Sequence, residues 1–155
     1  MGASNRHTAD ESHSVRERPV WESRGPKGAS MSSAQPLKHV SFDKPDEVRE
    51  GDNSWLELVN LAGGAQVGRI TVQPGWKWSQ DVKPVAGTDL CMAPHQQYQI
   101  SGHIHVVMAD GTEVDASPGE ITSLPPGHDA WVVGDEPVVA IDWQGASVWA
   151  RTQEG

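Results

Sequence analysis

Short runs of alternating apolar and polar residues dominate the chain from residue 53 onward. The runs are rich in Val, Ile, Thr and Trp, and Gly, Pro and Asp separate them at intervals of about 8 to 12 residues. Alternation with a period of two predicts half-buried strands, and turn residues at this spacing are typical of a sandwich or barrel. No useful length of helical periodicity interrupts the pattern. The pattern therefore predicts an all-β fold, a small antiparallel β-barrel.

The predicted strands are all short. They lie at residues 55–61, 67–72, 76–79, 96–100, 103–108, 112–115, 121–124, 130–133, 138–143 and 147–150. The clearest hairpin joins 103–108 to 112–115 through Asp110-Gly111, because a tight primed turn needs positive φ and an Asp-Gly pair tolerates it. Upstream, the sequence suggests a short strand at 39–42 and a helical turn at 45–49.

The N-terminal part of the chain has a different composition. Residues 1–36 carry single apolar residues scattered among Ser, Arg, Glu, Asn, Pro and His, too few to offset the entropy of ordering the segment. The segment resembles neither a secretory signal nor an organelle transit peptide, and Met31 is a candidate natural start. We therefore expect a disordered arm at 1–36, a lead-in segment at 37–52, the barrel domain at 53–150 and a C-terminal tail at 151–155.

Composition narrows the classes of partner. The 155 residues fit one domain, and 12 Lys and Arg against 21 Asp and Glu give a net charge of −9, which would repel a phosphate backbone. No apolar run approaches the roughly 20 residues that span a bilayer. One cysteine excludes an internal disulfide and is compatible with a reducing compartment. We expect a cytoplasmic protein that binds neither nucleic acid nor membrane.

One run of residues carries a recognisable motif. Residues 119–128, Gly-Glu-Ile-Thr-Ser-Leu-Pro-Pro-Gly-His, combine a glycine turn, a short strand and a sharp Pro-x-Gly turn. This run resembles the second signature of the cupin family, G-x5-P-x-G-x2-H-x3-N. Residues 98–102 resemble the end of the first signature, G-x5-H-x-H-x3,4-E-x6-G, and the hairpin falls between the two. The resemblance covers about residues 55–145 and extends to a group of small bacterial cupins without an assigned reaction.

The resemblance implies a jelly-roll barrel (double-stranded β-helix), often a homodimer, with a divalent metal on three His and one Glu. In this chain the Glu position falls on His95, the first-signature His positions fall on Asp89 and Cys91, and the second-signature His position falls on Ala130. None keeps the family residue. His128 precedes Ala130 by two residues, so strand alternation places it on the same side. Cys91, His95 and His128, with Asp89 as a further candidate, offer donors suited to Zn²⁺ or Fe²⁺.

Each candidate ligand also has an ordinary structural interpretation. Cys91 could be a small buried hydrophobe, and His95 a hydrogen-bonded interior histidine. His128 could cap local backbone groups after the Pro-Pro-Gly turn. His103 and His105 share a strand face beyond the family's ligand positions, and we expect a solvated face or a dimer seam there.

Aromatic and amide side chains are expected to line a pocket in the barrel. Polar groups inside a barrel carry a desolvation cost unless they bind something, which favours a ligand cavity over a solid core. The alternative is that the tryptophans simply fill the core of a small barrel. Tyr98 is the candidate catalytic proton donor. The expected pocket residues are Trp76, Trp78, Gln97, Gln99 and Trp131.

These features predict a bacterial small-molecule enzyme or binder whose pocket holds a divalent metal, Zn, Fe, Mn or Ni, on His95 and His128 with Cys91. Oxygenase, isomerase and lyase chemistry all remain open for a metal-dependent enzyme. The alternative is a metal-free sensory or metabolite-binding module, which the loss of the family's ligand residues favours. A structural dimer without ligand is a third interpretation. The expected partners are a small-molecule ligand and a second copy of the chain.

Overall fold

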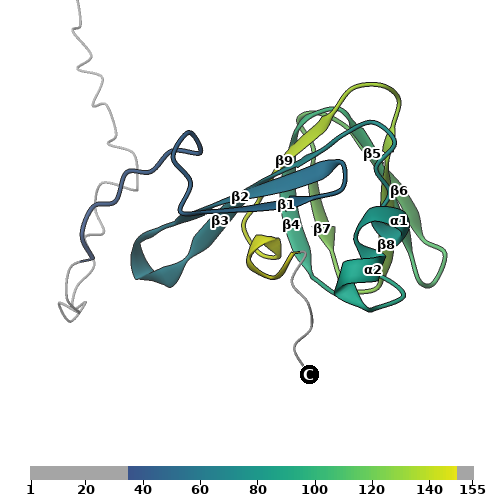
Figure 1. Cartoon of the computed structure of the whole chain (residues 1–155), viewed down its shortest axis with the longest axis horizontal. Coiled ribbons are helices and arrows are strands. Elements are labelled where there is room, and N and C mark those ends of the chain that lie inside the picture. The colour runs from purple at the N-terminus through teal and green to yellow at the C-terminus, as the bar shows by residue number, and fades with distance from the viewer. Residues whose placement is uncertain (1–34, 150–155) are drawn as a thin grey trace, which may run out of the picture. The chain divides into compact units, whose positions relative to one another are not determined.

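Two antiparallel sheets make up the part of the chain that the computed structural model describes, residues 35–149 (Figure 1). The larger sheet has the order β1-β2-β3-β9-β4-β7 and the smaller one has the order β6-β5-β8. The strands are β1 (Glu47–Gly51), β2 (Ser54–Asn60), β3 (Gln66–Val72), β4 (His95–Ser101), β5 (His103–Met108), β6 (Glu113–Ala116), β7 (Ile121–Leu124), β8 (His128–Val133) and β9 (Val138–Asp142).

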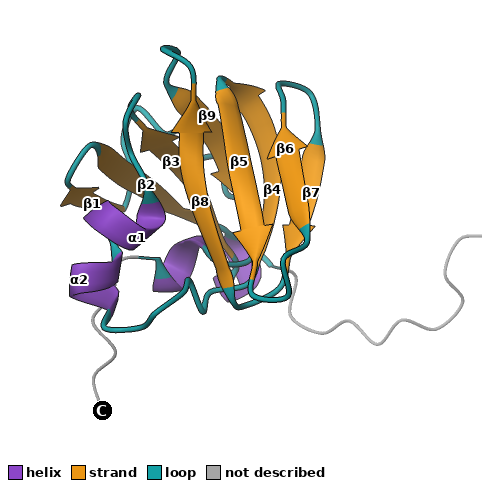
Figure 2. Ribbon diagram, turned by 90° about the vertical axis from the view of Figure 1, so that its right-hand side faces the viewer, coloured by secondary structure: helices purple, strands orange, loops and turns teal. Residues whose placement is uncertain are grey.

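Short helical elements complete the described residues. Helices α1 (Trp78–Asp81) and α2 (Lys83–Ala86) lie together at one end of the sheets, next to β8 in Figure 2. The 3₁₀ segments η2 (Ala62–Gly64) and η3 (Ala146–Val148) follow β2 and β9. None of the helices in residues 35–149 has the length and apolarity needed to span a bilayer.

The predicted all-β antiparallel class is confirmed, and the arrangement is consistent with a jelly roll. Every pairing between named strands is antiparallel. The strand ladders of the described residues belong to two separate sheets. The predicted arm lies outside the described residues except for residues 35 and 36, and so does the predicted C-terminal tail.

Several local predictions are wrong. The segment 76–79 makes only an isolated bridge at Lys77, after which α1 begins, with Asp81 accepting a hydrogen bond from the Lys77 backbone N–H at 2.7 Å. The segment 147–150 begins in η3, and 39–42 is not a strand. Residues 47–51, which overlap the predicted helical turn, form edge strand β1 because pairing with β2 outweighs local propensity.

The Asp110-Gly111 hairpin is confirmed, although its turn differs from the prediction. Strand β5 pairs with β6 across it, and the Gly111 N–H donates to the Met108 carbonyl at 2.9 Å. Gly111 has φ of +86°, whereas Asp110 does not share the positive φ that a primed turn requires at its first central position. Asp110 instead accepts a hydrogen bond from the Thr112 N–H with its side chain, which stabilises the longer turn.

Segment η3 packs onto β3 at a glycine. A Cβ at Gly68 would lie 2.7 Å from Leu56 Cδ1 and would also clash with the Ala146 Cβ. Arg49 holds the segment from β1, donating to the Trp149 carbonyl at 2.7 Å and the Ser147 carbonyl at 3.1 Å. The close packing and the arginine bonds together fix η3 and Trp149 at the end of the sheets.

We predict that Gly68→Ala lowers the free energy of unfolding by about 1–3 kcal/mol, the usual cost of overpacking, despite the better strand propensity of alanine. Chemical denaturation would measure it. Gly51→Ala is the control, since its Cβ would meet only the Ser54 hydroxyl at 3.0 Å, and we expect a change within about 0.5 kcal/mol. Equal stability of Gly68→Ala and the wild type would contradict the close packing of η3 on β3.

Candidate metal centre

Backbone hydrogen bonds bring Cys91 and His128 together. The Cys91 N–H donates to the His128 carbonyl at 2.8 Å, and the Gly127 N–H donates back to the Cys91 carbonyl at 2.7 Å. Directly opposed residues of an antiparallel bridge point their side chains to the same side. Gly127 has φ of +97°, which lets the chain turn sharply after the two prolines and deliver His128 to this position.

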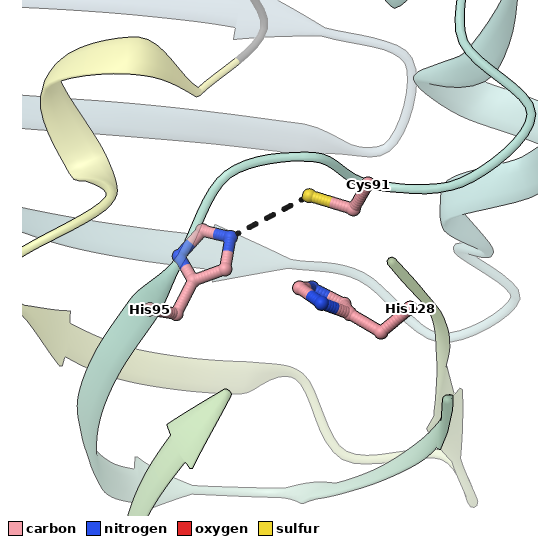
Figure 3. Close-up of side chains that lie close together, drawn as sticks. All are labelled: Cys91, His95 and His128. Carbon is pink, nitrogen blue, oxygen red and sulfur yellow. Dashed lines mark hydrogen bonds between the residues drawn. The ribbon is translucent and has the colours of Figure 1, made fainter. Parts of the chain in front are cut away.

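His95 reaches the same point from the start of β4. Its Nε2 lies 3.6 Å from Cys91 Sγ, and its ring centroid lies 5.4 Å from that of His128. One ligand atom from each of the three residues lies within 4.8 Å of the other two (Figure 3). All three side chains are buried. The structure therefore brings one thiol and two imidazoles, from separate parts of the chain, together in the interior.

The second ring nitrogen of His95 bonds a buried carboxylate. His95 Nδ1 lies 2.5 Å from Asp142 Oδ2, and Asp142 has no exposed surface. The other carboxylate oxygen accepts the backbone N–H groups of Gln144 at 2.9 Å and Gly145 at 3.0 Å. Because Asp142 accepts a hydrogen bond from Nδ1–H, the Nε2 of a neutral His95 carries no proton. Its lone pair faces Cys91 and is available to a metal ion.

His128 is oriented in the same way by a backbone carbonyl. Its Nδ1 donates to the Pro125 carbonyl at 3.0 Å, so Nε2 is the ring nitrogen available to the cluster. The local backbone capping that the sequence offered as an alternative for His128 is therefore present. Capping and ligation are compatible, because metal-bound histidines usually donate their other ring N–H to a carboxylate or carbonyl.

The pKa values of Cys91, His95 and Asp142 are shifted by burial and by their charged and hydrogen-bonding neighbours. Burial raises the pKa of Cys91, but hydrogen bonds and charges from His128 and His95 outweigh it and bring the value down to about 6. Burial lowers the pKa of His95, but Asp142 and Cys91 outweigh it and raise the value to about 9. Burial also raises the pKa of Asp142, yet bonds from His95 and two backbone N–H groups leave it lower than usual. At neutral pH the centre holds a thiolate beside an imidazolium.

A small cavity adjoins the three side chains. Its volume is about 40 Å³, and mainly apolar residues line it. This volume suffices for an ion or a few waters, since a water needs roughly 10–15 Å³ on this measure. Trp76 also lines the cavity, and its buried Nε1–H has no hydrogen-bond partner among the described residues. An acceptor in the cavity would satisfy this donor.

The predicted pocket residues divide into two groups. Trp76, Trp78 and Gln97 line the cavity, and Gln99 is buried but donates to the Ser101 and Gly102 carbonyls. The remaining pocket residue, Trp131, lies elsewhere, as do the candidate proton donor Tyr98 and the candidate ligand Asp89. Tyr98 is 42% exposed, and Asp89 forms an exposed ion pair with Lys83. The ring of Trp131 packs on the ring of His105, with 4.5 Å between the ring centroids. An interior location for Tyr98, Trp131 and Asp89 is therefore wrong.

Asp142 is the functional candidate that sequence reasoning missed. It lies at the end of a predicted strand, and a polar residue at the inward phase of an otherwise apolar strand was the available signal. Its link to His95 depends on the β4–β9 register, which places Asp142 opposite Gln97, two residues along from His95. A register between strands so distant in sequence is set by tertiary structure.

Solved structures of similar fold have low sequence identity to this chain. A cupin-like protein from Thermotoga maritima is 14% identical, with 66% of this chain and 86% of that chain covered and a TM-score of 0.41. The polyketide cyclase RemF from Streptomyces resistomycificus is 17% identical, with 70% and 81% covered and a TM-score of 0.46. A protein of unknown function from Rhizobium leguminosarum is 17% identical, with 70% and 98% covered and a TM-score of 0.49.

No protein-family model and no curated sequence matches the chain. The structures that match include one described as a cupin-like protein. The chemistry of the centre is argued from this chain's own residues.

We predict that above pH 9, where His95 is neutral, Asp142→Asn weakens Zn²⁺ binding by about 10–100-fold, because the carboxylate orients His95 and strengthens Nε2 as a metal ligand. Competition with a chromophoric chelator would measure the affinity. Asp115→Asn is the matched control, since Asp115 bonds His105 at 2.6 Å on the exposed face and should leave affinity unchanged. Equal losses in the two variants, or none in either, would contradict the assigned role.

Metal affinity should also depend on pH. Binding requires a thiolate and a neutral imidazole. Between pH 6.5 and 9 the Cys91 thiol, with pKa about 6, is ionised, while His95, with pKa about 9, must lose one proton to each metal ion. Zn²⁺ affinity should therefore rise about tenfold per pH unit in this window and level off above it. Affinity independent of pH from 7 to 8.5 would contradict the ionisation state described here.

Proposed function

We propose that this chain is a cupin-like small-molecule enzyme or binder that holds a divalent metal ion on Cys91, His95 and His128. The observation that carries the proposal is the orientation of both histidines. Asp142 and Pro125 engage the two Nδ1 atoms, and both Nε2 atoms are directed to the neighbourhood of the Cys91 sulfur, with His95 Nε2 at 3.6 Å from it. This arrangement places one potential ligand atom from each of the three side chains around a common point.

The donor set favours zinc, with ferrous iron second. Thiolate ligands select zinc, iron or copper(I), whereas manganese prefers carboxylate and water ligands. Three protein ligands with a nearby space are typical of zinc sites that keep one open position. Trp76 lines the cavity and its Nε1–H has no hydrogen-bond partner among the described residues, which also supports a hydrogen-bond acceptor in a ligand.

The bound ion would supply Lewis acidity toward a substrate oxygen or a water. The chain's own residues supply the rest. Asp142 stabilises positive charge on His95, and the apolar cavity excludes bulk water, which strengthens electrostatic interactions inside it. Trp76, which lines the cavity, has a buried Nε1–H without a partner among the described residues and would donate to a ligand oxygen within its reach. The reaction class is an open choice among oxygenase, isomerase and lyase chemistry.

We further propose the cytoplasm as the location and a homodimer as the assembly, as the sequence suggests. The exposed position of Tyr98 removes the support for it as the proton donor. The metal-free binding module remains the competing function, and the metal titration separates the two.

Protein purified without an affinity tag should bind one Zn²⁺ or Co²⁺ per chain, measured by metal analysis and absorption. Co²⁺ should produce a thiolate-to-metal charge-transfer band, because Cys91 is the only sulfur ligand in the cluster. Cys91→Ser should abolish the band, and His95→Ala should lower metal content at least tenfold. His105→Ala, on the outer face, is the control and should retain both.

A folded protein that binds none of Zn²⁺, Fe²⁺, Mn²⁺ or Ni²⁺ would contradict the proposal and favour the metal-free module. Metal content that is unchanged in His95→Ala would show that the ion lies elsewhere.

A further inference from the structure

A groove lies next to the candidate metal centre, separated from the small inner cavity by shared lining residues. Its volume is about 250 Å³, and α1, α2, the loop before β4 and the end of η3 form its walls. Three buried residues, Trp78, Cys91 and Trp149, line both this groove and the inner cavity. The groove therefore shares a wall with the centre, and that wall contains one of the candidate ligands. Its full lining is Trp78, Val82, Ala86, Thr88, Cys91, Met92, Ala93, Pro94, Val148 and Trp149.

The inner cavity is too small for an organic substrate. At about 40 Å³ it is far below the roughly 150 Å³ of a protein cavity that binds benzene. The groove exceeds that volume and lies just below the range of about 300–1,000 Å³ that drug-sized ligands occupy. A molecule of about one ring in size fits the groove, whereas only a small reacting group fits the inner cavity.

The lining of the groove determines the kind of ligand. Among residues 35–149, no Asp, Glu, Lys or Arg lines it, although the whole chain carries 33 such residues, 12 basic and 21 acidic. The one side-chain hydroxyl among its described lining residues, on Thr88, already donates to the Leu90 carbonyl at 2.7 Å. An anionic ligand would lose its hydration here without gaining a cationic partner among these residues.

The rim of the groove is apolar and partly exposed. Met92 is 52% exposed and Val148 is 49% exposed, so both present apolar surface to an incoming molecule. Methionine adapts its flexible side chain to ligands of different shape. The aromatic walls of Trp78 and Trp149 offer flat apolar surfaces at the inner end.

We propose that this groove binds a small, uncharged, apolar molecule, one ring or a short hydrocarbon in size, as the non-reacting part of the substrate. Its catalytic meaning rests on the proposed metal centre, but binding in the groove does not. The ligand lies against the same Cys91 whose sulfur belongs to the cluster, so occupancy of the groove alters the surroundings of the metal directly.

Benzene is the probe. Saturation-transfer NMR on the full-length metal-free protein should detect benzene binding, and benzoate should bind at least tenfold more weakly because of its charge. In Co²⁺-loaded protein, benzene should shift the charge-transfer band, since Cys91 lines the groove.

Ala86→Phe should fill the groove and weaken benzene binding at least tenfold without changing Co²⁺ affinity. Val148→Asp, at a half-exposed position that folding tolerates more readily, should do the same by placing a charge on the groove wall. Ala62→Phe, at an exposed residue of η2, is the matched control and should bind benzene as the wild type does.

The outcomes separate this inference from the proposed function. Benzene binding that both groove variants abolish, in a protein that binds no metal, would support the groove and overturn the metal centre. Metal binding without benzene binding, or benzene binding that neither groove variant affects, would overturn the groove alone. Benzene binding that appears only after deletion of residues 150–155 would assign the groove to the chain's own C-terminal segment and overturn the proposal of an external ligand.

Discussion

The buried bond between His95 and Asp142 is the interaction on which the rest of the site depends. It joins the neighbouring strands β4 and β9 beside the candidate metal centre. Asp142 also accepts hydrogen bonds from two backbone N–H groups of the turn before η3, which ties that turn to the same carboxylate. A fully buried carboxylate is costly unless it is paired and hydrogen-bonded, and Asp142 is both. Gly145 makes the arrangement possible, since a Cβ there would lie 2.6 Å from His95 Nδ1.

The electrostatic consequences follow from that bond. Asp142 favours the charged form of His95, and His128 and His95 together favour the thiolate of Cys91, so the buried carboxylate contributes to the ionisation of both groups. Binding a divalent cation would replace the proton on His95 with a charge that both the thiolate and the carboxylate stabilise. A cation bound at the proposed site would therefore meet histidines whose orienting partners are already in place.

Sequence reasoning predicted the three-residue cluster from the family resemblance and one local rule. Counting back from Gly102 in the resembled first signature gave Cys91 and His95, and strand alternation placed His128 on the same side as Ala130. The same alternation contradicts the interior positions expected for Tyr98 and Trp131, which have the opposite phase to His95 and His128 on their strands. Aromatic character favours burial, but the side of the strand on which a residue lies determines whether its side chain faces the interior.

Other features could not be predicted from local pattern. The role of Asp142 depends on the register of strands distant in sequence, and β1 depends on an available edge of β2. Residues 76–79 alternate between apolar and polar side chains, as in a strand. The Asp81 carboxylate accepts a hydrogen bond from the Lys77 backbone N–H, however, and helix α1 begins at Trp78. In each case a tertiary contact or a side chain to backbone bond outweighed the local preference.

X-ray absorption spectroscopy of the zinc-loaded protein tests the central claim most directly, because it identifies the atoms bound to the ion. The account predicts one sulfur at about 2.3 Å and two imidazole nitrogens at about 2.0–2.1 Å, with a light atom completing the coordination. In Cys91→Ser the sulfur shell should disappear and the imidazole shell should remain. A zinc environment made only of nitrogen and oxygen in the wild-type protein would show that Cys91 is not a ligand and would contradict the site described here.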